Sequence, residues 1–177
     1  GNSVFMEYKK LENGSFEKLA QRNVDFGGGL ERITMAVNGE PDIFKVDALF
    51  AAIKTMEGAF KIPYDGNGEF TKPFRVIADH LRAAVFLLSD GVIPSNKERG
   101  YVLRRFIRRA AFAAYRHGVR DSGWSRAVVG ALIGAYREAY AELANRESEI
   151  TEELSLEIEH FYETLEAGLR IFEGVKK

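Results

Sequence analysis

Apolar residues recur along this chain with two different periods, and each period predicts a different kind of element. Residues 4–11, VFMEYKKL, begin with an alternation of apolar and polar positions that is typical of a strand. The turn signal ENG follows at 12–14, and residues 15–26 supply a return strand. The sequence therefore predicts a β-hairpin near its start.

From residue 29 onward, apolar positions mostly follow the period of an α-helix. The glycine- and proline-containing stretch 61–74 is the best internal linker. The predicted helices span residues 29–39, 42–60, 73–91, 100–118, 123–143 and 148–177. The inward positions of the second and third helices are Leu49, Phe50, Ile53, Met56, Phe74, Ile77, Leu81, Val85 and Leu88. The fold class is mainly α: a helical bundle preceded by a short hairpin and a helix.

Composition limits the class of protein. The chain has 177 residues, enough for one ordinary domain or two small ones, and 46% of them are apolar, which predicts a folded core. No apolar run is long enough to span a membrane, and the first residues lack a signal-peptide pattern. The absence of cysteine excludes disulfides and thiolate metal sites, and it fits a reducing, cytoplasmic compartment.

The net charge of −1 conceals an uneven distribution of charge along the chain. Residues 97–120 hold eight Lys and Arg but one acid, Glu98. Residues 138–173 hold eleven Glu. A basic segment followed by an acidic one predicts a local site for a polyanion rather than a uniformly basic protein.

The basic residues of the predicted helix 100–118 gather on one side of it. At about 100° per residue, Arg104, Arg105, Arg108 and Arg109 share one arc, opposite an apolar arc. Four neighbouring guanidinium groups repel one another unless anions lie nearby. Two interpretations stay open and do not exclude each other: a solvated face paired with the Glu-rich C-terminal helix, or a contact to a nucleic-acid backbone.

The loop PSNKERG, residues 94–100, comes just before that helix. An Asn side chain can bond to the edge of a base, but Ser and Asn in front of a helix are more often N-terminal caps. From the residues alone, capping is the favoured interpretation for Ser95 and Asn96.

A run of three glycines opens the first predicted helix, in VDFGGGLERI at 24–33. Glycine lets the backbone approach a ligand closely, a helix N-terminus attracts anions, and Arg32 could reach a phosphate. The stretch is neither a Walker loop nor a dinucleotide fingerprint. Taken alone, it favours a tight strand-to-helix turn.

The histidines do not predict a metal or catalytic site. His80, His117 and His160 are too far apart in sequence to form a zinc pair on one helix. His80 in ADHLR lies on a mostly apolar helix, where a hydrogen-bonded core or surface histidine is expected. No Ser-His-Asp spacing is present.

Four stretches, taken in order, resemble consecutive parts of the class II alanyl-tRNA synthetases. They are NSVFMEY (2–8), VDFGGGLERI (24–33), FRVIADHLRAAVFLLSDGVIPSNKERGYVLRRFIRRA (74–110) and FYETLEAGLRIFE (161–173). The block SNKERGYVLRRFIRRA is long and specific. The resemblance implies that residues 1–70 are the C-terminal end of a class II catalytic domain with its motif 3. It implies that residues 71–177 are a helical domain that recognises the tRNA acceptor stem.

The resemblance implies a nucleotide site on the glycine-rich stretch. Arg32 would be the catalytic residue and would contact the phosphates of ATP. Gly27 and Gly29 would let the backbone pass close to the nucleotide. An arginine at this point can neutralise the charge that develops as the adenylate forms. ATP and Mg²⁺ are the expected cofactors of the full-length enzyme, and neither is expected to bind tightly to this chain.

The resemblance also implies an alanine pocket. Asp25 would hold the ammonium group of the amino acid, because a carboxylate pairs with an ammonium. Asn2 and Val4 would line the pocket. Two residues depart from the family pattern at the pocket wall: Phe26 stands where Thr is usual, and Gly28 where Met is usual.

In this family the identity of the acceptor stem is set by a G·U wobble pair, and Asn96 corresponds to the residue that reaches it. A G·U pair exposes an amino group in the wide minor groove of A-form RNA, and an Asn carbonyl can accept a hydrogen bond from it. By resemblance, the stem or the packing around it would be held by Arg99, Arg104, Arg105, Arg108 and Arg109. The family's downstream Asp segment, similar to YDTYGFP, does not occur in this sequence.

The resemblance places class II motifs 1 and 2 before residue 1 and the editing domain after residue 177. We therefore expect an excised part of an alanine–tRNA ligase that does not form the adenylate by itself. The absence of Cys and of paired His excludes a free-standing editing protein. The alternative function is a synthetase-derived helical module that binds a protein partner. Its face would be Leu154, Ile158, Phe161, Leu165 and Leu169, although these positions more simply close the bundle.

Overall fold

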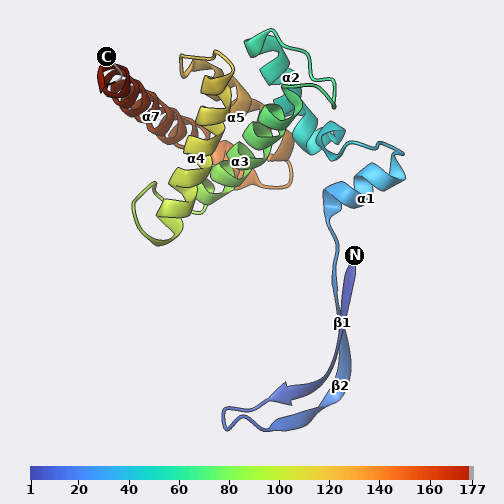
Figure 1. Cartoon of the computed structure of the whole chain (residues 1–177). Coiled ribbons are helices and arrows are strands. Elements are labelled where there is room, and N and C mark those ends of the chain that lie inside the picture. The colour runs from blue at the N-terminus through green and yellow to red at the C-terminus, as the bar shows by residue number, and fades with distance from the viewer. Residues whose placement is uncertain (176–177) are drawn as a thin grey trace. The chain divides into compact units, whose positions relative to one another are not determined.

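A two-stranded hairpin and a short helix form the first part of the chain. The computed structural model describes residues 1–175 and divides the chain into two compact units, Gly1–Ile43 and Phe44–Lys177. In the first unit, β1 (Asn2–Lys10) pairs antiparallel with β2 (Phe16–Gly27), and α1 (Leu30–Val37) follows (Figure 1). The predicted hairpin and helix are confirmed.

The hairpin is irregular at one point, beside Glu7. Asn2 pairs with Gly27 and Met6 with Asn23, but Tyr8 pairs with Lys18, so the register shifts at this bulge. The Glu7 carboxylate lies 3.3 Å from Lys18 Nζ and 3.4 Å from an Arg22 guanidinium nitrogen. One acid therefore bridges the two sides of the bulge, where the ladder of backbone hydrogen bonds is interrupted.

The second unit is a bundle of helices, as the apolar period predicts. The short 3₁₀ turn η1 (Ile43–Lys45) leads into it. The α-helices are α2 (Asp47–Phe60), α3 (Thr71–Ser89), α4 (Glu98–Arg116), α5 (Gly123–Tyr136), α6 (Ala141–Asn145) and α7 (Glu147–Val175). Among the described residues, α7 is the longest helix, and its C-terminal half runs out of the bundle (Figure 1). The last two residues of the predicted helix 148–177 lie outside the described part of the chain.

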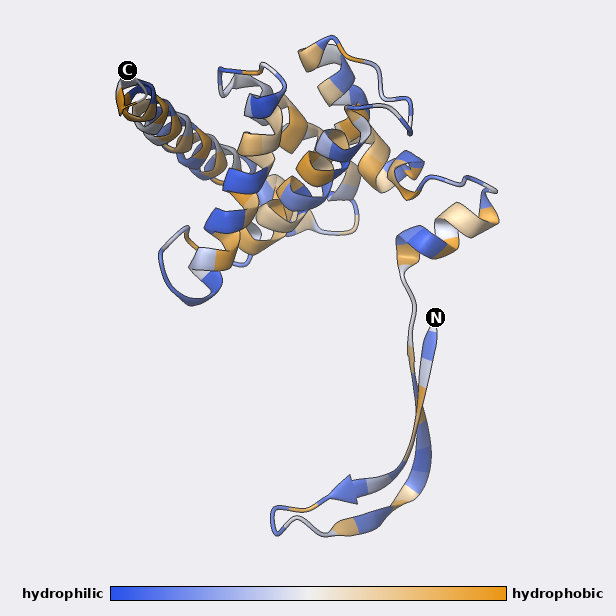
Figure 2. Ribbon diagram, viewed as in Figure 1, coloured by the Kyte–Doolittle hydropathy of each residue, from blue (hydrophilic) through white to orange (hydrophobic). Residues whose placement is uncertain are grey.

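The core lies between α3 and its neighbours. Leu81, Leu103, Ile107, Leu132 and Leu154 are among its fully buried side chains, and they come from four different helices. All the inward positions that the sequence predicts for α2 and α3 are buried, except Phe50, which is half-buried. Apolar residues occur along every helix of the bundle (Figure 2). Burial of these faces is the main force that holds the unit together.

Two predicted helices are each divided into two elements. Residues 42–60 become η1 and α2 because Val46 is extended, with ψ 146°, and buries its side chain at the break. Residues 123–143 become α5 and α6. At this break Tyr140 leaves the helical conformation, with ψ 80°, and the rings of Tyr136 and Tyr140 both stand edge-on to Phe86. Tertiary packing overrides the local helical preference at both points.

By packing, α2 belongs to the same unit as α3. The predicted functional division at residue 70 stays a prediction. None of the helices within residues 1–175 is long and apolar enough to cross a membrane.

Tyr162 of α7 joins three helices at the centre of the bundle. Its hydroxyl donates to the Ala111 carbonyl of α4 at 3.2 Å and accepts from Trp124 Nε1 of α5 at 3.4 Å. Burial raises the pKa of Tyr162 to about 12, because the phenolate would lose its hydration there.

Tyr162→Phe should cost about 1–2 kcal/mol at pH 8, because two buried polar groups lose their partner. The folded-state pKa of about 12 lies above the ordinary value of 10.0, so the contribution of Tyr162 is complete below pH 10 and is lost as pH rises toward 12. The difference in free energy of unfolding between the wild-type protein and the variant, measured with urea, should therefore be smaller at pH 11.5 than at pH 9. Parallel decline of the two proteins would contradict this assignment.

Candidate functional site

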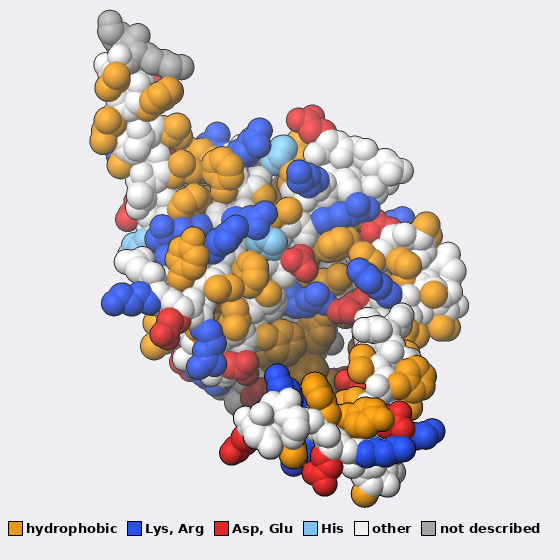
Figure 3. Space-filling model, turned by 60° about the horizontal axis from the view of Figure 1, so that its bottom comes forward, with side chains coloured by type: hydrophobic (Ala, Val, Ile, Leu, Met, Phe, Trp, Pro, Cys, Tyr) orange, Lys and Arg blue, Asp and Glu red, His pale blue; other side chains and the backbone are white. Residues whose placement is uncertain are grey.

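A groove of about 390 Å³ runs between the outer face of α4 and α7. It is lined by Asn96, Tyr101, Arg104, Arg105, Arg108, Arg109, Phe112 and Phe161. The groove therefore brings together Asn96 and all four arginines of the predicted cationic arc. Arg99 is exposed in the first turn of α4 and does not line the groove. Figure 3 shows Lys and Arg side chains among apolar side chains where α7 emerges from the bundle.

Two of the four arginines pair with the acidic C-terminal helix. Arg108 Nε donates to Glu157 Oε1 at 2.7 Å, and Arg104 Nε lies 3.3 Å from the same oxygen, within ion-pair distance but without hydrogen-bond geometry. The Glu157 side chain is only 8% exposed, so this carboxylate is a buried charge that needs partners. For Arg104 and Arg108, the predicted pairing with the Glu-rich helix is confirmed.

The other two arginines are exposed. Within residues 1–175, Arg105 and Arg109 make no hydrogen bond or ion pair through their side chains. Alternate arginines along α4 thus have different environments, because α7 covers only one edge of the arc. The exposed pair supplies the uncompensated positive charge of the groove.

Aromatic rings lie on the same stripe of α4 as the arginines. Tyr101 and Phe112 are 51% and 44% exposed and stand three helical turns apart, about 16 Å. Phe161 adds a ring from α7, and the Arg108 guanidinium lies 5.7 Å from its centroid. Of these three aromatics, Phe161 was predicted only as part of the apolar face of the C-terminal helix, and Tyr101 and Phe112 were not predicted as site residues. The positions 101, 105, 108 and 112, spaced at helical intervals, were the signal that could have identified two of them.

The loop before α4 holds Asn96 without using it as a cap. The N-cap residue of α4 is Lys97, and no side chain caps the helix. Instead, Asn96 Oδ1 accepts from Arg104 Nη1 at 2.5 Å, and Ser95 Oγ donates to the Lys97 carbonyl at 3.0 Å. The expectation that Ser95 and Asn96 cap the helix is wrong, because Arg104 on the second turn offers Asn96 a charged donor.

Gly100 lets this loop lie against the helix. A Cβ at this residue would collide with Ser95 Oγ and would stand 2.5 Å from the Ile93 carbonyl oxygen. The Ser95 backbone N–H also donates to the Gly100 carbonyl at 3.1 Å. Gly100 was not among the residues that the sequence predicted to position the site.

The glycine-rich stretch forms a second, open groove of about 470 Å³ within the first unit. Four of the predicted nucleotide and alanine residues line it: Asn2, Gly27, Gly29 and Arg32. The expected strand-to-helix turn is confirmed, since β2 ends at Gly27 and α1 begins at Leu30. Val4 and Asp25 face each other across the hairpin and do not line this groove.

The two departures from the family pattern meet at one aromatic ring. A Cβ at Gly28 would stand 3.0 Å from the Phe26 ring and 3.2 Å from Ile33 Cδ1. A Cβ at Gly1 would stand 2.8 Å from the same ring. Phe26 therefore fills the space that side chains at positions 1 and 28 would need.

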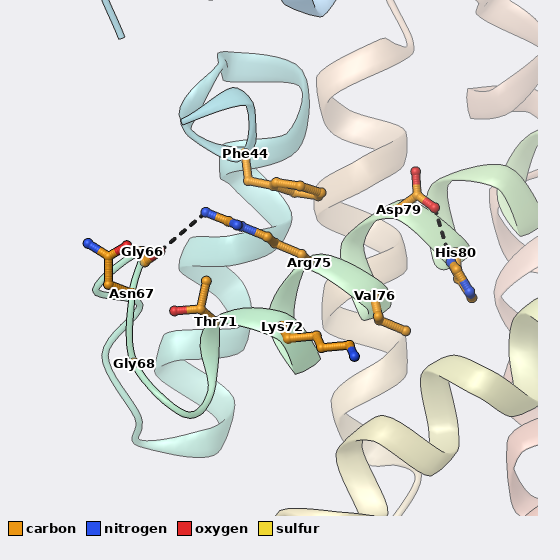
Figure 4. Close-up of a pocket in the computed structure, with 10 residues that line it drawn as sticks. All are labelled: Phe44, Gly66, Asn67, Gly68, Thr71, Lys72, Arg75, Val76, Asp79 and His80. Atoms are coloured by element: carbon orange, nitrogen blue, oxygen red, sulfur yellow. Dashed lines mark hydrogen bonds and ion pairs between the residues drawn. The ribbon is translucent and has the colours of Figure 1, made fainter. Parts of the chain in front are cut away.

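A third hollow, of about 590 Å³, lies beside α3 and is lined by none of the predicted binding residues. Arg75 crosses it beneath the Phe44 ring and donates to the Gly66 carbonyl at 3.3 Å (Figure 4). His80 Nδ1 lies 3.0 Å from Asp79 Oδ2, and this hydrogen bond lowers the pKa of Asp79. His80 is thus a hydrogen-bonded core histidine, as expected. Through its hydrogen bond to Gly66, Arg75 of α3 stabilises the position of the loop 61–70.

The apolar face of α7 changes along its length. Leu154 and Ile158 are buried in the core, Phe161 and Leu165 are half-buried, and Leu169 is 40% exposed. Its first half closes the bundle, which is the simpler of the two interpretations of that face.

Comparison with known proteins gives consistent matches. The family model described as tRNA synthetases class II (A) matches residues 1–177. The chain is 39% identical over 172 residues to the alanine–tRNA ligase of Thermoanaerobacter sp. (strain X514), covering 97% of this chain and 20% of that protein. It is 43% identical over 175 residues to that of Nitrobacter winogradskyi, covering 97% and 19%. It is 38% identical over 176 residues to that of Chlamydia muridarum, covering 99% and 20%. The chain thus spans about a fifth of the length of these curated relatives.

Gly100→Ala should destabilise the protein by about 1–3 kcal/mol, because the new methyl group forces the loop 93–97 away from α4. Urea unfolding measures the loss. Gly134→Ala is the matched control: no atom lies within 4 Å of its Cβ position, so it should stabilise α5 by about 0.5–1 kcal/mol. Equal effects of the two substitutions would refute the packing role of Gly100.

Proposed function

Because the chain belongs to the alanyl-tRNA synthetase family of class II, we propose that the groove of α4 binds the acceptor stem of tRNA(Ala). The parent enzyme would be an alanine–tRNA ligase that attaches alanine to this tRNA at the expense of ATP in the cytoplasm. The part described here would mainly recognise the stem and its G·U pair.

The pairing of exposed guanidinium groups with exposed rings on one stripe of α4 supports this proposal most directly. Arg105 and Arg109 can contact phosphates, and phosphate contacts supply much of the affinity for nucleic acid. Tyr101 and Phe112 offer flat apolar surfaces to sugars or unpaired bases. A solvated structural face has no need of exposed aromatic rings between its charges.

Asn96 would supply the specificity of the groove. It lies at the groove edge, beside the cationic stripe, where a stem held by its phosphates would present its minor groove. The Asn96 carbonyl oxygen has two lone pairs, and Arg104 uses one. The other can accept from the guanine amino group that a G·U pair exposes.

We propose a separate role for the first unit. Gly27 and Gly29 leave the backbone accessible, and the exposed Arg32 lines the same groove, which suits the phosphate chain of ATP. Asn2 at this groove and the neighbouring residues Val4 and Asp25 would form part of the alanine pocket. Mg²⁺ would accompany ATP and neutralise its phosphate oxygens.

Replacing both exposed arginines, Arg105→Gln with Arg109→Gln, should weaken acceptor-stem binding and flatten its salt dependence. Each lost phosphate contact should lower the slope of log K against log salt by about 1. Titration of a labelled RNA hairpin at several salt concentrations measures both quantities. The control is Arg137→Gln, an exposed arginine at the end of α5 and outside the groove. An unchanged slope in the double variant would contradict the proposed interface.

The 177-residue chain should support no alanine-dependent exchange of pyrophosphate into ATP. Asp25 and Arg32 are exposed in the described structure, whereas adenylate formation needs preorganised groups shielded from water. Exchange of labelled pyrophosphate is measured with and without alanine, beside a full-length relative as positive control. Alanine-dependent exchange above the rate without protein would refute the expectation.

A further inference from the structure

A chain of contacts connects the buried acid of α7 to the Asn at the edge of the groove. Glu157 Oε1 lies 3.3 Å from Arg104 Nε, and Arg104 Nη1 donates to Asn96 Oδ1 at 2.5 Å. Arg104 Nη2 also donates to the Pro94 carbonyl at 3.3 Å. One guanidinium group therefore contacts Glu157 of α7 on one side and two residues of the loop, Pro94 and Asn96, on the other.

Arg104 decides which way the amide of Asn96 faces. With Oδ1 toward the guanidinium, a donor meets an acceptor. The flipped amide would present its NH₂ group to Arg104, donor against donor, and would lose the contact. A fixed amide matters at this position, because the two orientations read opposite hydrogen-bonding groups on a base pair.

Glu157 in turn holds Arg104 in place. The Arg104 side chain is 24% exposed, and the Glu157 side chain 8%. At that depth, breaking the ion pair would leave the Glu157 carboxylate without a partner and poorly hydrated. The carboxylate therefore restrains the position of the Arg104 guanidinium group. Arg108 Nε donates to the same oxygen at 2.7 Å, and this hydrogen bond fixes the orientation of the Glu157 carboxylate.

We propose that Glu157 is a specificity-determining positioning residue for the acceptor stem: through Arg104 it fixes the Asn96 amide in the orientation that prefers G·U. This inference rests on the proposed function of the groove. Glu157 touches no RNA, and its negative charge opposes non-specific binding of phosphate. Removal of the Glu157 charge should therefore lower the preference for G·U while it maintains or raises the overall affinity for RNA.

The test compares binding of two RNA hairpins that differ only in a G·U or a G·C pair of the acceptor stem. In Glu157→Gln, the preference for G·U should fall by about tenfold, the ratio that one good polar contact to a base supplies. The G·C hairpin should bind as tightly as before or more tightly at low salt, because the groove gains a net positive charge. A structural defect would instead weaken both complexes and lower the melting temperature.

Glu152→Gln is the matched control on the same helix. Glu152 pairs with Arg126 at 2.9 Å on the exposed surface and does not line the groove. The Glu152→Gln substitution therefore removes one negative charge from α7 at a distance from Arg104 and Asn96. It should keep the G·U preference. In an Asn96→Ala background, Glu157→Gln should leave the G·U to G·C ratio unchanged, because both residues act through one contact.

Arg104→Lys keeps the protein testable if Glu157→Gln does not fold. A lysine retains the charge but has no fork with which to contact Glu157, Asn96 and Pro94 together. It should lose the G·U preference to a similar extent. Full preference in either folded variant, or an equal loss of affinity for both hairpins, would overturn the role of Glu157. Absence of G·U preference in the wild-type chain would instead overturn the proposed function itself.

Discussion

The arginine-lined groove of α4 depends on one buried carboxylate. The Glu157 carboxylate of α7 lies 2.7 Å from Arg108 and 3.3 Å from Arg104, both on α4, where four arginines occur within six residues. Without an anion on that side, the guanidinium groups would repel one another along the helix. A buried ion pair adds little net stability, because desolvation offsets the attraction. Its effect here is on side-chain orientation: Arg104 and Arg108 turn toward Glu157, whereas Arg105 and Arg109 face solvent.

The two candidate sites are built on supports of different rigidity. The groove of α4 stands on a helix whose opposite face is packed into the core through Leu103, Ile107 and Ala110. The glycine-rich stretch stands on a two-stranded sheet whose large apolar side chains, Phe5 and Val24 among them, are exposed within the described residues. A sheet of two strands has little stability of its own. The first site is preorganised by its own unit, whereas the second is not.

The amino-acid pattern predicted most of the elements and the arginine arc, and it left open whether those arginines contact the Glu-rich helix or a nucleic acid. Helical periodicity follows from local geometry, so the large apolar side chains that α3 buries could be predicted: Phe74, Ile77, Leu81, Val85 and Leu88. The contact between Glu157 and Arg104 joins residues 53 positions apart and depends on how α7 crosses α4. The contact of Asn96 with Arg104 could not be predicted from the residues for the same reason. Capping is a local interpretation, and the partner that displaced it lies two turns into the helix. The breaks at Val46 and Tyr140 likewise arise from packing, which a single sequence does not reveal.

The ring of Phe26 has a consequence for how this stretch could have diverged from its relatives. With the ring in place, a side chain at position 28 meets it at 3.0 Å from its first carbon. Positions 26 and 28 therefore depend on each other: a side chain at 28 and the ring at 26 fit together only if one of them shifts by a few tenths of an ångström. Glycine at 28 leaves the ring in its place without that shift.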